Sequence, residues 1–394
     1  MHKSFNNKSF NPGFLTSSFH QRIAVPLLLA LLCLPVQAAA PQSQHGDANP
    51  GQAHGRPHGF MERANPIAVE RAIKAQERHT EALLKIPGVH GTGVAWRADG
   101  EMVVKVYTNR GANGRGRNIP QSVDGIPVEI QAIGPFYALN IPCENRAGGY
   151  CNSAVEPQFS ATAVDPDERH SRPVPIGVSA GHVDISAGTI GCRVTSGCHT
   201  YALSNAHVFA DENKGDPGDE IVQPGPADGG VSPRDRIGTL FEAKKIIMSP
   251  IAGNRVDAAI IAVTTKKMGY ETPSNGYGRP RPAIANAALN MDVMKYGRTT
   301  GMTYGYVSDV NVTVVVEYDA GDARFVDQIM ISTTSGPNFS SPGDSGSLVV
   351  GSGGFVHRRP VGLLFAGADG VTLANPIGFV LNAFDVELDI DDGG

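Results

Sequence analysis

Apolar and polar positions are organised differently in the two halves of the chain. In the first half, an apolar stripe over residues 67–84 predicts one helix that begins at Asn65-Pro66 and ends before Pro87-Gly88. Short apolar runs then predict strands at residues 93–96, 102–107 and 126–130, with a turn at Ala98-Asp99-Gly100. Together these elements predict a small α+β unit over residues 65–135.

From about residue 170 onward, short apolar runs alternate with clusters of Gly, Pro, Asp and Ser. Examples are residues 202–204, 258–263, 312–316 and 348–350. The chain of 394 residues holds 47 glycines and 28 prolines, which suit short strands joined by tight turns better than helical bundles. The second half is therefore expected to be all β, as an antiparallel barrel or sandwich.

The N-terminal residues read as an export signal. Lys3, Lys8 and Arg22 are followed by an apolar run over residues 23–36 and by the small-residue site Val36-Gln37-Ala38. The run is short for a bilayer of about 30 Å, so cleavage after residue 38 is expected, with an uncleaved anchor as the alternative. Residues 39–64, rich in Gln, His, Gly, Asn and Pro, read as a flexible linker. The mature chain is then secreted or periplasmic and has no membrane partner.

Charge adds little to this picture. Lys and Arg number 33 and Asp and Glu 38, and no long run carries a single sign. Neither a nucleic acid nor an anionic membrane is an expected partner.

Four cysteines remain once the signal segment with Cys33 is removed: Cys143, Cys151, Cys192 and Cys198. An even number in an exported protein predicts two disulfides, for which three connectivities are open. The local pairs Cys143–Cys151 and Cys192–Cys198 require the least loop closure and are the expected disulfides. A zinc site is the rival interpretation, but the spacings lack CxxC and no histidine pattern completes four ligands. No metal or cofactor is expected.

Three segments carry candidate chemistry. In Gly343-Asp344-Ser345-Gly346, the serine is a candidate nucleophile, and its own N–H and that of Gly343 can bind an oxyanion. His207 directly follows the apolar segment 201–204 and can serve as the base, and Asp257 precedes another apolar strand and can orient the imidazole. The bland alternatives are a Gly-rich turn, a structural histidine and a strand cap.

Taken together, the segments resemble the chymotrypsin-like serine peptidases over about residues 170–387. The order His, Asp, Ser differs from that of subtilisin-like and α/β-hydrolase chains. The resemblance implies two six-stranded antiparallel β-barrels, mainly β, with the small α+β unit before them and a peptidase domain over residues 155–387. His207 and Asp257 would come from the first barrel and Ser345 from the second.

A closer resemblance points to the bacterial secreted trypsin-like peptidases and the Narrow-Leaf-1-like group. It rests on the segment Lys295–Gly301 with Gly305-Tyr306-Val307, and on Val361–Gly367 with Ala374–Ile377. These segments would form a substrate-binding strand and a pocket wall. The implied pocket residues are Phe339, Ser340, Phe365, Ala366 and Gly367.

The chain also departs from trypsin itself. Phe339 stands six residues before the serine, where trypsin has an acidic residue, so an apolar or small substrate side chain is expected rather than Lys or Arg. No Ile-Val-Gly-Gly activation terminus precedes the barrel, so Asp344 is expected to bond within its own loop.

The sequence thus predicts a secreted serine endopeptidase that cleaves protein or peptide substrates through an acyl-enzyme. A catalytically silent binding or chaperone module on the same fold, and an esterase with the same triad, are the alternatives. The unit over residues 65–135 is interpreted as an attached accessory domain or as a pro-segment.

Overall fold

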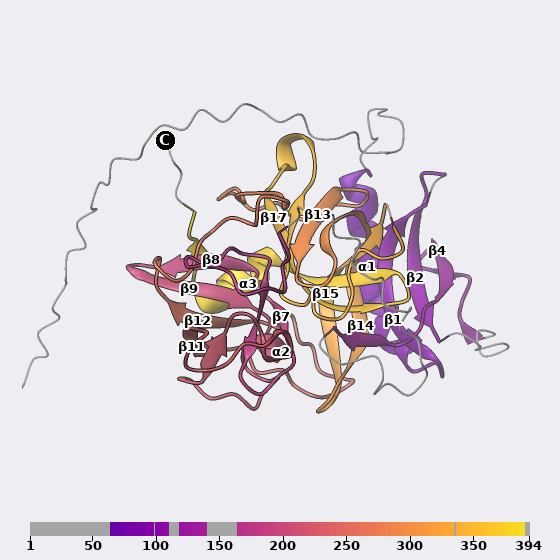
Figure 1. Ribbon diagram of the computed structural model, residues 1–394. Helices are drawn as coiled ribbons and strands as arrows, with labels where there is room; N and C mark the ends of the chain where they lie inside the picture. The colour runs from indigo at the N-terminus through magenta and orange to yellow at the C-terminus, as the bar shows by residue number, and fades with distance from the viewer. Residues whose placement is uncertain (1–63, 98, 110–117, 140–163, 335, 391–394) are drawn as a thin grey trace, which may run out of the picture. The chain divides into compact units, whose positions relative to one another are not determined.

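The computed structural model describes residues 64–97, 99–109, 118–139, 164–334 and 336–390 (Figure 1). The predicted signal peptide, nearly all of the linker, and Cys143 and Cys151 lie outside these residues. Within the described ranges, no helix combines the length and apolar character needed to cross a membrane.

The small α+β unit has the helix and strands that its sequence predicts. Helix α1 (Pro66–Leu84) begins at Asn65, whose side chain accepts a hydrogen bond from the backbone N–H of Ile67. The strands that follow are β1 (Val89–Trp96), β2 (Met102–Thr108), β3 (Ser122–Val123) and β4 (Ile126–Ala132). Buried side chains of α1, Ala72 and Ala75 among them, pack on apolar side chains of β1 and β2. This apolar contact holds the helix on the sheet.

The first large β-unit is an antiparallel sheet of six strands flanked by two strands of two residues each. The six are, in spatial order, β8 (Cys192–Ser196), β9 (His199–Ser204), β12 (Ala259–Val263), β11 (Arg236–Ala243), β10 (Glu220–Val222) and β6 (Ser179–His182). The flanking strands are β19 (Glu387–Leu388) and β7 (Gly188–Thr189).

The second β-unit closes on itself. Its order is β13 (Asp292–Gly297), β16 (Leu348–Gly351), β17 (Pro360–Ala368), β18 (Val371–Pro376), β15 (Gly321–Thr333) and β14 (Gly301–Tyr318). Pairing between β13 and β14 completes the ring. The expected fold, mainly β with two antiparallel β-units preceded by a small α+β unit, is confirmed.

Strand β14 pairs with strands of the second β-unit and with a strand of the small unit. It pairs with β15 and β13 inside the ring, and its middle pairs antiparallel with β1, for example Val94 with Val310. The short strand β5 (Phe136–Ala138) also lies beside β14 and, on its other side, beside β17. The small unit therefore continues the sheet of the second β-unit.

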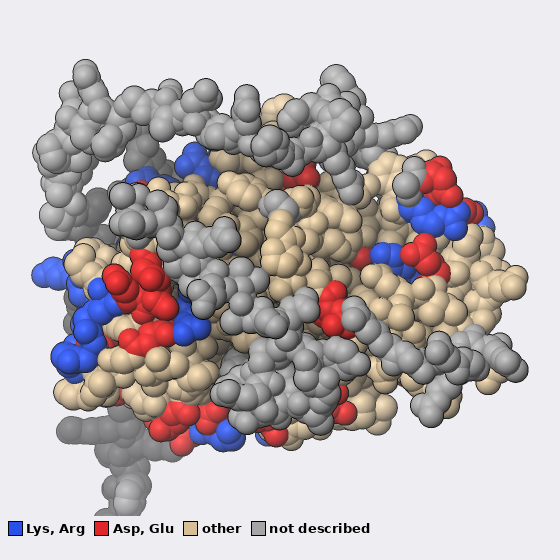
Figure 2. Space-filling model, turned by 45° about the vertical axis from the view of Figure 1, so that its right-hand side comes forward, with Lys and Arg blue, Asp and Glu red and all other residues tan. Residues whose placement is uncertain are grey.

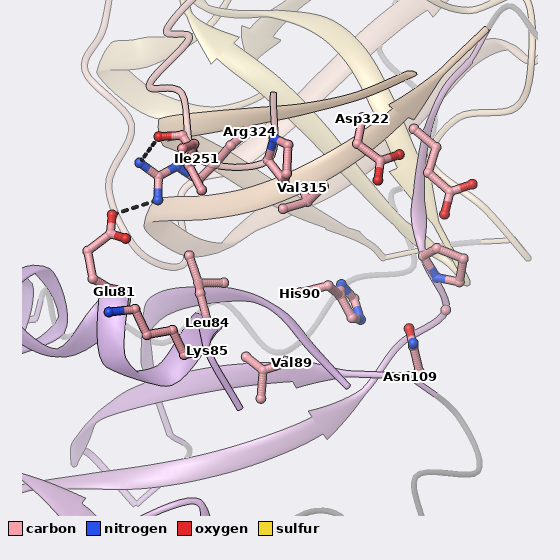
Figure 3. Close-up of a pocket in the computed structure, with 14 residues that line it drawn as sticks. Glu81, Leu84, Lys85, Val89, His90, Asn109, Ile251, Val315, Asp322 and Arg324 are labelled. Carbon is pink, nitrogen blue, oxygen red and sulfur yellow. Dashed lines mark hydrogen bonds and ion pairs between the residues drawn. The ribbon is translucent and has the colours of Figure 1, made fainter. Parts of the chain in front are cut away.

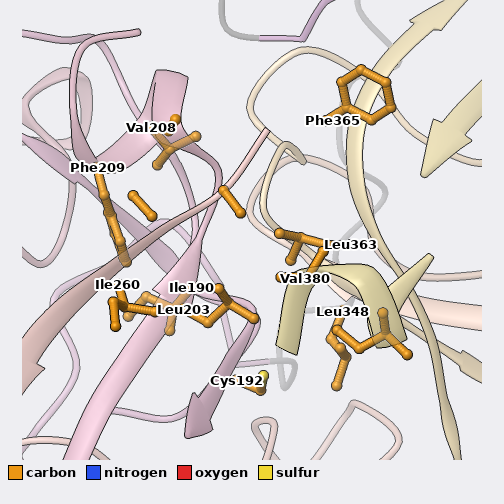
Figure 4. Packing of buried hydrophobic residues seen from close by; sticks show 14 of the residues in the cluster. Ile190, Cys192, Leu203, Val208, Phe209, Ile260, Leu348, Leu363, Phe365 and Val380 are labelled. Atoms are coloured by element: carbon orange, nitrogen blue, oxygen red, sulfur yellow. The ribbon is translucent and has the colours of Figure 1, made fainter. Parts of the chain in front are cut away.

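The remaining elements are short: helices α2 (Ala206–Phe209) and α3 (Ile377–Phe384), with 3₁₀ turns η3 (Pro226–Asp228) and η4 (Gly354–Val356). Apolar side chains of both large β-units share one core, in which Ile190 and Leu203 belong to the first and Leu348 and Leu363 to the second (Figure 4). That shared core holds the two units against each other.

The predicted disulfide between Cys192 and Cys198 is wrong. Cys192 begins β8 opposite Leu203 and is a free, buried thiol (Figure 4), whereas Cys198 lies in the turn at the other end of the β8–β9 hairpin. Cys192 and Ser196 lie four residue steps apart along an extended strand, which is about 13 Å. Cys198 lies in the turn beyond Ser196, whereas a disulfide spans roughly 7 Å at most. Cys198 is disulfide-bonded, but not to Cys192.

Charged side chains form small groups on the face drawn in Figure 2. Acidic and basic residues lie next to one another in these groups, with uncharged surface between them. Among the ion pairs of the described residues is that of Arg236 with Glu220, at 2.6 Å.

Candidate active site

Two neighbouring strands of the first β-unit bring His207 and Asp257 together. Strand β9 ends at Ser204 and leads into α2, which carries His207, while Asp257 lies just before β12. Because Ala259 pairs with Ser204, the residues after β9 and before β12 meet at the same edge of the sheet. The side-chain amide of Asn205 donates to the backbone carbonyl of Asp257 at 2.7 Å and fixes this junction.

Each carboxylate oxygen of Asp257 has polar partners. Oδ2 lies 2.5 Å from Nδ1 of His207, and Oδ1 accepts the backbone N–H groups of Ala206 (2.8 Å) and His207 (3.2 Å). His207 and Asp257 are both 0% exposed. A buried carboxylate with this many donors is held in one orientation, and so is the imidazole bonded to it.

Tyr318, at the end of β14, is a further partner that the sequence did not reveal. Its hydroxyl donates to Oδ2 of Asp257 at 2.8 Å. Burial and the neighbouring Asp257 carboxylate raise the pKa of Tyr318 well above its ordinary value, so the phenol keeps its proton. Tyr318 lies 61 residues from Asp257 at the end of an apolar run, and no local motif distinguishes it from a core tyrosine.

Asn375 on β18 holds the backbone of Asp257 from the second β-unit. Its Oδ1 accepts the N–H of Asp257 at 3.0 Å, and its Nδ2 donates to Gln328 at 2.6 Å. The position of Asp257 thus depends on both β-units.

Ser345 lies in the loop that leads into β16 and is also 0% exposed. Its backbone carbonyl accepts the N–H of Thr189 on β7 at 2.8 Å, and its hydroxyl donates to the carbonyl of Phe365 at 3.3 Å. Nε2 of His207 is buried and has no hydrogen-bond partner in the part of the chain that the structure describes. The serine hydroxyl is therefore bonded away from the imidazole in this conformation.

The two glycines around Ser345 are required by the backbone. Gly343 and Gly346 have φ of 97° and 92°, a region that favours glycine. A Cβ on Gly346 would lie 2.1 Å from the hydroxyl of Ser204 and 2.2 Å from the carbonyl of Thr189. Gly346 thus allows the serine loop to pack on the first β-unit.

Asp344 is buried and joins the serine loop to the segment after β13. It accepts the N–H groups of Thr299 (2.9 Å) and Ser341 (2.9 Å), and it forms an ion pair with the buried Lys295 at 3.5 Å. Burial lowers the pKa of Lys295, and the charge of Asp344 opposes that shift. The expected bond within its own loop, to Ser341, is confirmed, but most partners of Asp344 lie on the segment 295–300.

The predicted pocket residues lie in the loop before Ser345 and in strand β17. Phe339 is fully buried in an apolar cluster inside the second β-unit, and the hydroxyl of Ser340 bonds that of Thr372 at 2.6 Å. Ala366 and Gly367 lie in β17 and pair with both β18 and β5. The side chain of Phe365 packs against Phe325, with ring centroids 4.8 Å apart, and belongs to the shared core.

A cavity of about 580 Å³ lies elsewhere, between α1, β1 and the β14–β15 hairpin (Figure 3). His90 lines it, and Arg324 crosses it to Glu81 at 2.6 Å and to the carbonyl of Ile251 at 2.7 Å. None of the predicted catalytic residues lines this cavity. Among the described residues, no group of three or more His, Cys, Asp or Glu is placed to hold a metal ion.

Several solved serine protease structures are similar to this chain. One described as a glutamic acid specific serine protease with a histidine triad in substrate binding is 21% identical, with a TM-score of 0.40, over 55% of this chain and 100% of its own. Thermobifida fusca Protease A is 18% identical, with a TM-score of 0.37, over 55% and 99%. An α-lytic protease homologue is 22% identical, with a TM-score of 0.37, over 54% and 98%. No protein-family model and no curated protein matches the chain.

Proposed function

We propose that the chain is a serine endopeptidase in which Ser345, His207 and Asp257 form the catalytic triad. The observation that carries this proposal is the buried His207–Asp257 pair. Its carboxylate is bonded on both oxygens, and its imidazole keeps Nε2 without a partner among the described residues. A buried nitrogen without a partner costs free energy, and such a cost is typical of catalytic sites. The nitrogen that lacks a partner is the one that would accept the serine proton.

The reaction follows from these positions. The hydroxyl of Ser345 turns from the carbonyl of Phe365 toward Nε2 of His207, gives up its proton and attacks a substrate carbonyl carbon. The N–H groups of Gly343 and Ser345 stabilise the oxyanion, and Asp257 stabilises the imidazolium. His207 returns the proton to the leaving amine, and water then hydrolyses the acyl-enzyme.

The loop that carries Gly343 and Ser345 is held by an ion pair between two side chains of the same chain. The ion pair between Lys295 and Asp344 is made without a newly cut N-terminus, which is the arrangement expected of a peptidase whose loop is set on folding. The backbone of β17 favours a peptide over a simple ester, because at Ala366 and Gly367 it pairs with an extended segment, β5.

We also propose that the chain is exported, with residues 1–38 as signal peptide and residues 155–387 as the peptidase domain. The basic residues, the apolar run and the small-residue site at the N-terminus support the export. Its substrates are proteins or peptides, and no cofactor is required.

A fluorophosphonate probe tests the activity. The probe should label the full chain and not the Ser345→Ala chain, while Ser308→Ala, a change in a partly buried serine on β14, should leave the labelling intact. Because the carbonyl of Leu139 occupies the N–H of Gly343, the assay is also run on a Leu139→Asp chain, in which that contact is weakened. If neither chain is labelled or hydrolyses casein between about pH 6 and 9, the proposal is wrong.

A further inference from the structure

Four residues that directly follow the small unit lie along the proposed active site. Strand β5 (Phe136–Ala138) fills the space between β14 and β17, parallel to the first and antiparallel to the second. Its register on β17 pairs Ala138 with Ala366 and Tyr137 with Gly367. All four residues from Phe136 to Leu139 are at most 9% exposed. An extended peptide added to a sheet edge in this way is a common mode of peptide recognition.

Leu139 continues this strand into the loop of Ser345. Its N–H donates to the carbonyl of Phe365 at 3.3 Å, and its carbonyl oxygen accepts the N–H of Gly343 at 2.6 Å. The same Phe365 carbonyl oxygen also accepts the hydroxyl of Ser345. The serine hydroxyl and the N–H of Leu139 are therefore hydrogen-bonded to one common acceptor. The carbonyl of Leu139 therefore lies where the carbonyl of a bond to be cut would lie.

The side chain of Leu139 fits the apolar pocket. It is 6% exposed and belongs to the same buried cluster as Phe339, Val361 and Leu364. Gly367 forms one wall, since a Cβ placed there would lie 3.5 Å from Cδ2 of Leu139. Phe339 in turn packs on Gly305, where a Cβ would lie 2.8 Å from its ring. The side chain of Leu139 is therefore surrounded by apolar groups.

We propose that residues Phe136–Leu139 are the enzyme's own first substrate, with Leu139 in the specificity pocket, and that Ser345 cuts the peptide bond that follows Leu139. This inference rests on the proposed function. It adds to that function the site of self-cleavage and a preference for leucine before the cut.

The step balances without any co-reactant except water. The oxygen of Ser345 forms an ester with the carbonyl carbon of Leu139 while the carbon–nitrogen bond breaks. The serine proton passes through His207 to the leaving nitrogen, which becomes a new amino terminus. Water then hydrolyses the ester, which restores the serine hydroxyl and leaves a carboxylate on Leu139.

Contacts made by Gly134 and Phe136 hold strand β5 beside the proposed active site. The N–H of Gly134 donates to Asp369 in the β17–β18 turn at 2.6 Å, and Phe136 is buried against Tyr107 and His90, with ring centroids 6.0 and 5.4 Å away. Tethering converts binding into an intramolecular event with a high effective concentration. The product strand keeps these contacts after the cut, so it competes with external substrates.

Intact-mass analysis and N-terminal sequencing of the full chain test the proposal. The wild-type chain should yield a fragment that starts with Asn140-Ile141-Pro142, and the Ser345→Ala chain should remain whole at that bond. Leu139→Met should preserve the cut and Leu139→Asp should abolish it. Ile130→Asp is the matched control, because Ile130 is an exposed apolar residue of the same unit, and it should leave the cut unchanged.

Peptide substrates test the pocket. Among p-nitroanilides of the form Phe-Tyr-Ala-X, leucine at X should exceed lysine and glutamate by at least about 100-fold in kcat/KM, because a charge in a dry apolar pocket is not compensated. Gly367→Val should remove most of the leucine activity. A preference for lysine or glutamate would overturn the pocket assignment.

The outcomes separate the two proposals. If the probe labels Ser345 but the wild-type chain stays whole after Leu139, the self-cleavage is refuted and the peptidase activity stands. If neither the wild-type chain nor the Leu139→Asp chain is labelled or active on any of the peptides, the proposed function itself fails.

Discussion

At the scale of single residues, the site depends on how completely the Asp257 carboxylate is hydrogen-bonded. Its partners come from α2, from His207 itself and from Tyr318 on β14. Tyr318 is a positioning residue, because it touches Asp257 and acts on the imidazole only through that carboxylate.

Tyr318→Phe should lower kcat by about 10-fold with little change in KM, since a hydrogen bond to a charged group is worth about 1.5 kcal/mol or more. The kinetics of a leucine p-nitroanilide would measure both constants. Tyr304→Phe, on the same strand but 44% exposed, is the control and should behave as wild type. An equal fall in kcat for both variants would show that the hydrogen bond from Tyr318 to Asp257 does not contribute to catalysis.

Cys192 is expected to be chemically silent in the folded chain. Burial raises the pKa of its thiol to about 12, so almost no thiolate forms at pH 8. Iodoacetamide should leave Cys192 unmodified in the native protein and alkylate it in about 6 M guanidinium chloride. Alkylation of the native protein at a rate similar to that of a free thiol would contradict the burial.

At the scale of elements, the loop before β16 is held by charge as well as by backbone bonds. Lys295 and Asp344 are both 0% exposed, so each is the counter-charge of the other in a dry environment. Lys295 also donates to the carbonyl of Gly301 at 3.0 Å. The pair connects β13 to the loop that carries Gly343 and Ser345.

Lys295→Met should cost about 3–5 kcal/mol of unfolding free energy, because it leaves a buried carboxylate without its counter-charge. It should also lower kcat/KM, since Gly343 lies next to Asp344. The double variant Lys295→Met/Asp344→Asn should regain part of the stability, because no uncompensated charge remains. Urea unfolding of the three chains provides the measurement, and a double variant less stable than Lys295→Met would disprove this account.

The contact between β1 and β14 depends on a glycine. A Cβ on Gly93 would lie 2.3 Å from the hydroxyl of Tyr107, which donates to Asp309 of β14 at 3.1 Å. Gly93→Ala should therefore destabilise the chain by about 1–3 kcal/mol through overpacking. Gly353→Ala has no atom within 4 Å of the new Cβ and should change stability by less than about 0.5 kcal/mol. If the urea midpoint falls equally in the Gly93→Ala and Gly353→Ala chains, the prediction is wrong.

At the scale of the whole molecule, the small unit and the second β-unit share one sheet through β14. Besides the strand pairing, Asn311 donates to Gln76 of α1 at 2.8 Å, and Lys105 lies 3.1 Å from Asp309. Removing the small unit would expose the edge of β14 and would take β5 away from β17.

A chain of residues 155–394 alone should therefore unfold at least about 5 °C below the full chain and should aggregate more readily. Thermal unfolding and size-exclusion chromatography would measure both effects. If the shorter chain has the same Tm and hydrolyses peptides as fast as the full chain, the small unit is an accessory domain with no part in folding.

The sequence by itself determined the mainly β fold, the helix and strands of the small unit, and the candidates Ser345, His207 and Asp257. It could do so because these features are local: an apolar run, a glycine that a backbone turn requires, a polar residue at a strand end. Only the tertiary structure identified Tyr318, Asn375, Lys295 and the segment Phe136–Leu139, and only it removed Cys192 from a disulfide. Each of those contacts joins segments that are distant in the chain or depends on the direction of a side chain. Strand pairing and burial determine which distant segments meet and where a side chain points, and no local sequence pattern shows either of these.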